Sequence, residues 1–143
     1  MYRKILVALE NGPADETILP HVANLAKTLG SELLLVHVAD GFAARNFDQL
    51  KLAESQEMKD DRGYLEGAAE KLRVMGLTVG TFLALGDPAE GILKTAADGR
   101  CDLIAMTTHG HRLLGDIVYG STINEVRHKA TVAMLLVRAG KSM

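Results

Sequence analysis

The sequence predicts an α/β fold, a three-layer sandwich in which helices cover both faces of a five-stranded parallel sheet. Short continuous apolar runs rich in β-branched residues alternate along the chain with segments of helical periodicity. Such runs are typical of strands buried on both faces, and their alternation with helices requires a parallel sheet with right-handed crossovers. The 143 residues contain no linker, repeat or low-complexity segment, which predicts a single domain over residues 1–143.

The first half of the chain is expected to supply two strands and two helices. Residues 4–10, KILVALE, form the first expected strand, and the helix that follows opens near Pro13 and stops at Gly30. Pro20 lies inside this helix, where we expect a kink or a late start of the regular part. The second strand covers residues 32–40, and it leads through a polar loop into a long helix whose apolar face carries Tyr64, Leu65, Ala68, Leu72 and Met75.

The second half of the chain is expected to supply three strands and two helices. Residues 77–86 form the third strand, after which Asp87 caps a helix and Pro88 occupies its first position. The fourth strand reads CDLIAMTT, and a long loop separates it from a helix in which Ser121 is expected at or near the start. The fifth strand is the apolar run at residues 131–139.

Composition and charge exclude several classes of partner. The formal net charge of −2 offers no electrostatic attraction for nucleic acid or for an acidic membrane surface. No apolar run is long enough to cross a bilayer. The first apolar run ends in Glu10 and lacks the small-residue cleavage site of a signal peptide, so it is interpreted as a strand. Cys101 is the sole cysteine and cannot form an intrachain disulfide, which favours a reducing compartment, the cytoplasm.

A glycine-rich stretch, THGHRLLGDIVYGST, follows the fourth strand at the sheet edge where parallel α/β folds bind ligands. Gly110, Gly115 and Gly120 allow tight turns and close approach of the backbone to a ligand. If a helix starts at Ser121, its first N–H groups have no intrahelical partner and suit a phosphate, with Ser121 or Thr122 adding a hydroxyl. A long loop with Ser121 as an ordinary helix cap explains the same pattern, and spacing alone leaves both interpretations open.

Several stretches together resemble the universal stress protein family, in its small single-domain form. The resemblance covers essentially the whole chain and rests on KILVALE, LLLVHV, GDPAEGILKTAADGRCDLIAM and YGSTINEVRHKATVAMLLVR. The family's nucleotide signature is Gly, two residues, Gly, nine residues, Gly, then Ser or Thr. Gly110, Gly120 and Ser121 match this signature, whereas Thr107 occupies the first glycine position.

The resemblance implies a Rossmann-like, adenine nucleotide alpha hydrolase-like sheet with strand order 3-2-1-4-5 and an adenine site at its carboxyl edge. Leu9, Glu10 and Val38 are implied to lie beside the adenine, although ATP-binding members usually have Asp where this chain has Glu10. His111 and Arg112 are implied to lie near the terminal phosphates, next to the signature glycines. Thr107 adds a side chain that either crowds the ribose or phosphates or donates a hydrogen bond to them.

The resemblance implies a stress-response module that binds an adenine nucleotide, ATP. Mg²⁺ is expected to bind, if at all, through the phosphates of the nucleotide. The last strand, residues 131–139, is implied to pair with its copy in a homodimer. The alternative is a nucleotide-free dimeric interaction protein of the same fold. A phosphorylated receiver domain ranks last, because the acidic cluster that it needs is absent from the strand ends. The sequence shows no efficient catalytic constellation, so at most slow ATP hydrolysis is expected. His109 and His111 lack the further ligands that a protein metal site needs.

Overall fold

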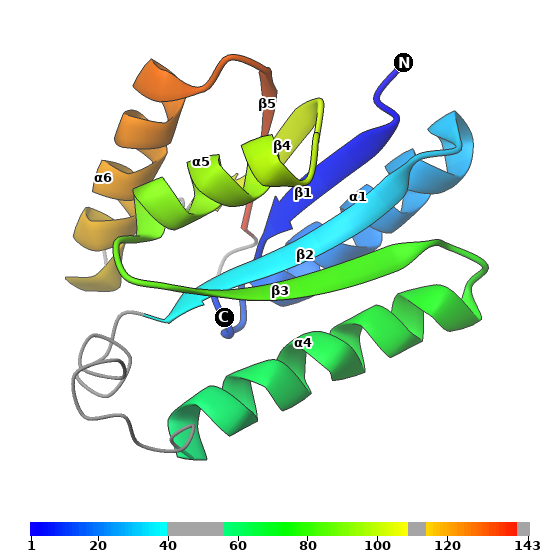
Figure 1. Ribbon diagram of the computed structural model, residues 1–143, viewed down its shortest axis with the longest axis horizontal. Helices are drawn as coiled ribbons and strands as arrows, with labels where there is room; N and C mark the ends of the chain where they lie inside the picture. The colour runs from blue at the N-terminus through cyan, green and yellow to red at the C-terminus, as the bar shows by residue number, and fades with distance from the viewer. Residues whose placement is uncertain (40–55, 109–113, 140–143) are drawn as a thin grey trace.

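The computed structural model describes residues 1–39, 56–108 and 114–139, with the backbone alone between residues 114 and 120. Strands and helices alternate along the described chain, as the pattern of apolar runs predicts (Figure 1). The elements are β1 (Lys4–Ala8), α1 (Asp15–Leu29), β2 (Glu32–Ala39), α4 (Gln56–Val74), β3 (Val79–Leu85), α5 (Pro88–Asp98), β4 (Leu103–Thr108), α6 (Leu114–Lys129) and β5 (Ala133–Arg138).

The five strands form one sheet in the order β3-β2-β1-β4-β5, and every neighbouring pair is parallel. The predicted fold class and strand order are therefore confirmed. β1 lies at the centre, and all of its residues except Lys4 are buried, which explains why KILVA is a continuous apolar run rather than an alternating one. The chain crosses from one half of the sheet to the other between β3 and β4, so the carboxyl ends of β1, β2 and β4 meet where strand order reverses.

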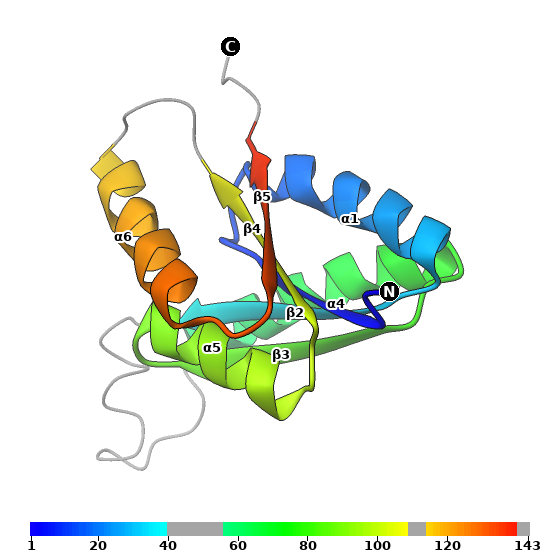
Figure 2. The same cartoon turned by 90° about the horizontal axis from the view of Figure 1, so that it is seen from above.

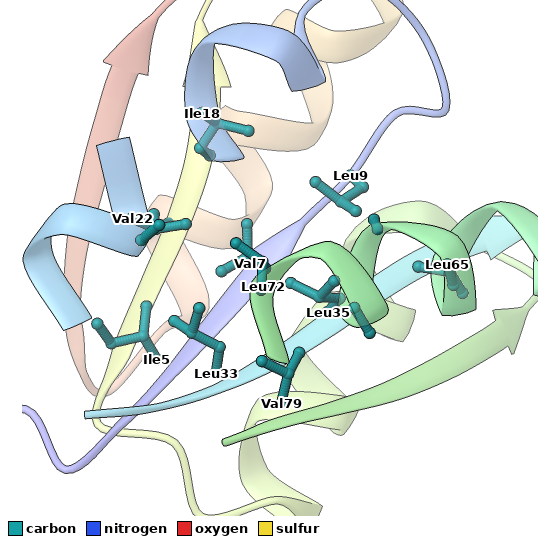
Figure 3. Close-up of a cluster of buried hydrophobic side chains, with 14 of the residues drawn as sticks. Ile5, Val7, Leu9, Ile18, Val22, Leu33, Leu35, Leu65, Leu72 and Val79 are labelled. Carbon is teal, nitrogen blue, oxygen red and sulfur yellow. The ribbon is translucent and has the colours of Figure 1, made fainter. Parts of the chain in front are cut away.

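Helices cover both faces of the sheet, α1 and α4 on one face and α5 and α6 on the other (Figures 1 and 2). Each face has its own apolar cluster because successive strand residues point to opposite sides. The cluster beneath α1 and α4 is drawn in Figure 3, where Leu35 of β2 lies among side chains from both helices and from β1. Among the described residues, no helix has the length and apolar character needed to cross a membrane.

α6 begins earlier than the sequence predicts. The helix was expected at or near Ser121, but it starts at Leu114, so Ser121 lies within it. Leu114, Ile117 and Val118 continue the apolar spacing of a helix upstream of Ser121. Glycine disfavours a helix interior by only about 1 kcal/mol per residue, so the glycines of this stretch weaken a helix without excluding one. The interpretation of Ser121 as a helix cap is therefore wrong for this structure.

Candidate functional site

A pocket of about 380 Å³ opens at the carboxyl ends of β1, β2 and β4. Its volume lies within the range of small-molecule sites, and its position is the one where open α/β sheets bind ligands. Side chains from six segments line it: Ala8, Leu9, Glu10 and Asn11; Val36, His37, Val38 and Ala39; Glu57 and Asp61; Pro88 and Ile92; Met106 and Thr107; Thr122 and Ile123. Of the residues singled out from the sequence, the structure brings together Leu9, Glu10, Val38, Thr107 and Thr122.

Glu10 and Thr107 are in direct contact across the centre of the sheet. The Thr107 hydroxyl donates a hydrogen bond of 2.9 Å to Oε2 of Glu10, although the two residues are 97 positions apart in the chain. Thr107 is buried, with 2% of its surface exposed. Hydrogen bonds to a carboxylate are shorter and stronger than neutral ones, so this contact holds the head of the Glu10 side chain against β4.

The backbone of Glu10 is held separately, by Asp15 at the start of α1. The Asp15 carboxylate accepts hydrogen bonds of 2.9 Å from the N–H groups of both Glu10 and Asn11. Asn11 has a φ of 61°, in the left-handed region that Asn tolerates better than most residues. Asp15 is 1% exposed, and these bonds replace the water that a buried carboxylate has lost. Asp15 therefore shapes the turn that carries Glu10 into the pocket.

Tyr64 of α4 donates a third hydrogen bond to Asp15, with a distance of 2.5 Å between its hydroxyl and Oδ2. Burial raises the pKa of the Tyr64 hydroxyl, and the hydrogen bond and negative charge of Asp15 raise it further because both disfavour a phenolate at this position. The contact links the turn after β1 to a helix that lies 49 residues later in the chain. Tyr64 was predicted only as part of the apolar face of a helix, and its polar role follows from the fold.

Stability at alkaline pH is expected to depend on Tyr64. An unfolded tyrosine loses its proton near pH 10, whereas folded Tyr64, whose pKa is raised, retains it. Above about pH 10 the folded chain thus binds more protons than the unfolded chain, and stability falls as the pH rises. Urea unfolding of wild type and Tyr64→Phe, measured between about pH 8 and 11, is expected to show a steeper loss in wild type. Parallel curves would contradict this assignment.

A second set of polar contacts in the pocket lining involves His37. His37 Nδ1 donates to the carbonyl oxygen of Leu9 at 2.9 Å, so that the turn after β1 is also tied to β2. The amide of Asn11 donates to Oδ1 of Asp61 at 2.8 Å, and the other oxygen of Asp61 lies 3.8 Å from Nε2 of His37. Sequence reasoning did not select Asn11 or Asp61, because their only signal is a polar side chain on a turn and on a solvated helix.

The other wall of the pocket is apolar and is formed where α5 lies against β2. Val38, Pro88, Ile92 and Met106 present hydrocarbon surface suited to a flat ring. The close approach of α5 depends on Gly91, since a Cβ at this position would lie 3.0 Å from Cγ2 of Val38. The pocket thus combines an apolar wall with carboxylates, an arrangement that orients a ligand by a few polar groups.

The predicted phosphate end of the site is only partly formed. The N–H of Ser121 lies seven residues after the start of α6, where helix N–H groups bond to the carbonyl four residues earlier. The N–H groups of Gly120, Ser121 and Thr122 lie inside α6 and are therefore not the unpaired donors of a helix start. This corrects the predicted phosphate site, which depended on a helix that begins at Ser121. Ser121 is exposed and does not line the pocket, while Thr122 is buried and does.

The predicted residues Gly110, His111 and Arg112 lie outside the described residues, as does His109. Within the described part of the chain, no group of three or more His, Cys, Asp or Glu side chains is placed to hold a metal ion. The pocket lining contains the carboxylates of Glu10, Glu57 and Asp61, and in the described ranges it contains no Lys or Arg.

Comparison with known proteins supports a family assignment. The model of the universal stress protein family matches residues 1–138. The chain is 28% identical to universal stress protein MJ0577 of Methanocaldococcus jannaschii, over 99% of this chain and 98% of that protein. A solved structure of MJ0577 is similar with a TM-score of 0.77 and covers 99% of both chains.

Two solved structures with lower sequence identity share the fold. One is a universal stress protein in complex with cAMP, 14% identical with a TM-score of 0.71, covering 97% of this chain and 98% of that chain. The other is the universal stress protein from Archaeoglobus fulgidus in complex with dAMP, 19% identical with a TM-score of 0.70, covering 95% of this chain and 98% of that chain. Because the family model spans nearly the whole sequence and the fold agrees, the chain belongs to the universal stress protein family.

Proposed function

We propose that this protein binds an adenine nucleotide, ATP, in the pocket at the carboxyl ends of β1, β2 and β4, as a nucleotide-dependent module of the stress response. The observation that carries the proposal is the pairing, in one pocket, of an apolar wall with a carboxylate held in place by Thr107. Two proteins of the same fold were solved with cAMP and with dAMP, both of which contain adenine.

The adenine ring lies, in this proposal, against the apolar wall beside Val38 and Ile92, with Leu9 at the turn after β1. The amino group of the base donates to the Glu10 carboxylate, which is longer by one methylene than an aspartate and is drawn back toward β4 by Thr107. The hydrogen bond between Thr107 and Glu10 therefore lets a longer acid serve at this position. Burial of a flat ring between apolar side chains supplies affinity, and the carboxylate supplies orientation.

The phosphates extend toward Thr122 and the segment that contains Gly110, His111 and Arg112, with Mg²⁺ held mainly by the phosphates and water. In the structure, the N–H groups near Gly120 and Ser121 belong to α6. Any ATP hydrolysis is slow, since no general base and nucleophile pair is built in the described lining.

Calorimetric titration with ATP tests the proposed function, with Glu10→Gln as the variant and Glu32→Gln as its matched control. Glu32 begins β2 at the opposite edge of the sheet and is exposed. Loss of a hydrogen bond to a charged group is expected to weaken ATP binding by about tenfold or more for Glu10→Gln, and Glu32→Gln is expected to bind like wild type. If folded wild type fails to bind ATP at millimolar concentration, the nucleotide-free interaction protein is the better interpretation.

We also propose a homodimer formed through the last strand, residues 131–139. Among the described strands β5 lies at the edge of the sheet, and Leu136 on it is 44% exposed, so this edge presents an apolar side chain beside backbone groups that can pair with another strand. Wild type is expected to scatter light as a dimer at micromolar concentration and Leu136→Asp as a monomer, because a charge at the seam must be desolvated. A monomeric wild type would overturn the proposal.

We further propose a cytoplasmic location, since the sole cysteine, Cys101, is buried and forms no disulfide within the chain.

A further inference from the structure

The face of the sheet that carries α1 and α4 holds a second cavity, a groove of about 640 Å³ between the two helices. Its volume lies in the range of small-molecule sites. Leu19 and Ala23 of α1 and Ala68 and Leu72 of α4 line it, and all four belong to the apolar cluster beneath these helices or pack against it. Among the described residues, Asn11 alone lines both this groove and the pocket at the carboxyl edge. The groove is therefore a separate, mainly apolar site.

Two glycines inside α4, Gly63 and Gly67, keep the groove open. Glycine disfavours a helix interior, because it loses more conformational freedom on folding than any other residue. A Cβ at either position would meet no atom of a neighbouring element within 4 Å, so close packing does not require glycine here. What the two glycines provide is the absence of side chains over the apolar lining.

The end of the groove near the start of α1 is acidic. Asp15 and Glu16 line it together with Tyr64, whose hydroxyl donates to Asp15. Burial raises the pKa of the Tyr64 hydroxyl, and the negative charges of Asp15 and Glu16 raise it further, so both charges act at this end. Glu16 is exposed, and the residues three and four positions after it are Leu19 and Pro20, so no base on its own helix pairs with it.

The opposite end of the groove carries a positive charge, from Lys71 in the last turn of α4. α1 and α4 each follow a strand of a parallel sheet, so both begin at its carboxyl edge, and Glu16 and Lys71 lie at opposite ends. Two acids of α4, Glu66 and Glu70, pair with Arg73 and do not neutralise Lys71. The groove thus has an acidic end, an apolar middle and a basic end.

We propose that this groove binds an amphiphilic cation, a molecule with one ammonium head and an alkyl chain. The head lies beside Glu16 and Tyr64, because a carboxylate and an aromatic ring both attract an ammonium group. The chain lies along Leu72 toward Met75, which is 43% exposed and offers apolar surface to cover. Lys71 disfavours the reverse orientation, since like charges repel.

Titration of the protein with decylammonium, decanol and decanoate, followed by the NMR shifts of backbone amides, tests the head group at constant chain length. Decylammonium is expected to bind with a dissociation constant of about 1 mM or tighter. Decanol is expected to bind about threefold more weakly, and decanoate more weakly still. Butylammonium is expected to bind at least about tenfold more weakly, because a shorter chain buries less apolar surface. The amides of Ala23, Gly63 and Gly67 are expected to shift, and that of Ala96, in α5 on the other face, to stay.

Two substitutions with matched controls test the location. Glu16→Gln is expected to weaken decylammonium binding by about twofold to fivefold and to leave decanol binding unchanged. Glu90→Gln, its control, changes an exposed acid in the first turn of α5 and is expected to bind like wild type. Gly67→Leu fills the groove and is expected to cost at least about tenfold in affinity, whereas Gly67→Ala adds only a Cβ and is expected to cost less.

Several results would overturn the inference. One is a wild type whose α1 and α4 amides do not respond to decylammonium, and another is decanoate that binds as tightly as decylammonium. Undiminished binding to folded Gly67→Leu would place the ligand elsewhere. Shifts of the groove amides with protein concentration alone would mean that a second copy of the chain covers the groove. Far-ultraviolet circular dichroism establishes folding, and Gly63→Leu serves as the blocking variant should Gly67→Leu not fold. The ATP titration reports on the other pocket, so nucleotide binding stands or falls separately.

Discussion

Replacement of Asp15 by alanine is expected to lower the free energy of unfolding by about 3 kcal/mol or more. The substitution removes the acceptor of three hydrogen bonds, from the N–H groups of Glu10 and Asn11 and from the hydroxyl of Tyr64. The site is buried, with Asp15 1% exposed, so water does not readily replace the lost partner. Each unpaired donor then bears the full cost of its desolvation.

Two variants serve as controls for the Asp15 prediction in urea unfolding. Tyr64→Phe removes one of the three bonds and is expected to cost about 1 kcal/mol. Asp98→Ala removes a carboxylate from the exposed ion pair of Lys94 and Asp98, whose side chains are 77% and 68% exposed, and is expected to change stability by about 0.5 kcal/mol or less. If Asp15→Ala is no more destabilising than Asp98→Ala, the turn after β1 does not depend on Asp15.

Leu35→Ala is expected to be the second most damaging change, with a loss of about 2 to 5 kcal/mol in the free energy of unfolding. Leu35 is fully buried in the cluster beneath α1 and α4, and Figure 3 shows it below α4, close to Leu72. Truncation removes three carbons and leaves a cavity that the surrounding close-packed side chains fill only in part.

Phe82→Ala is the matched control, since it removes a larger side chain from the neighbouring strand β3. Phe82 is 52% exposed at the edge of the sheet, and Phe82 pairs in register with Val36. We expect a loss of about 1 kcal/mol or less, because half of the ring is already in water. Urea unfolding of both variants gives the comparison. Similar losses would show that residue size, and not burial, decides the effect on this sheet.

The fold could be predicted from the sequence because its signals are local and repeated. Each strand is a short apolar run, and several boundaries have their own marker, such as Gly30 after α1 or Asp87 and Pro88 at the start of α5. The Asp87 side chain accepts a hydrogen bond from the Glu90 N–H at 3.0 Å, as expected of an N-cap. Strict alternation of strands with helices then restricts the architecture to a parallel sheet with covered faces.

The start of α6 could not be predicted in the same way, since two local signals conflict. Gly110, Gly115 and Gly120 favour a loop, while Leu114 and the apolar residues after it continue a helical pattern. Neither signal is strong, because glycine weakens a helix by about 1 kcal/mol per residue and a short apolar pattern gains stability only by packing. The outcome depends on what the segment packs against, which a local pattern does not contain.

The sequence by itself determined the order of the elements, the parallel sheet and the residues at its carboxyl edge, including Glu10, Val38 and Thr107. Only the tertiary structure decided which polar groups pair there. Thr107 meets Glu10 across 97 residues, Asn11 meets Asp61 across 50 and Tyr64 meets Asp15 across 49. The physical reason is that periodicity and capping act between near neighbours, whereas these contacts exist only once β1 lies between β2 and β4 and α4 covers the turn.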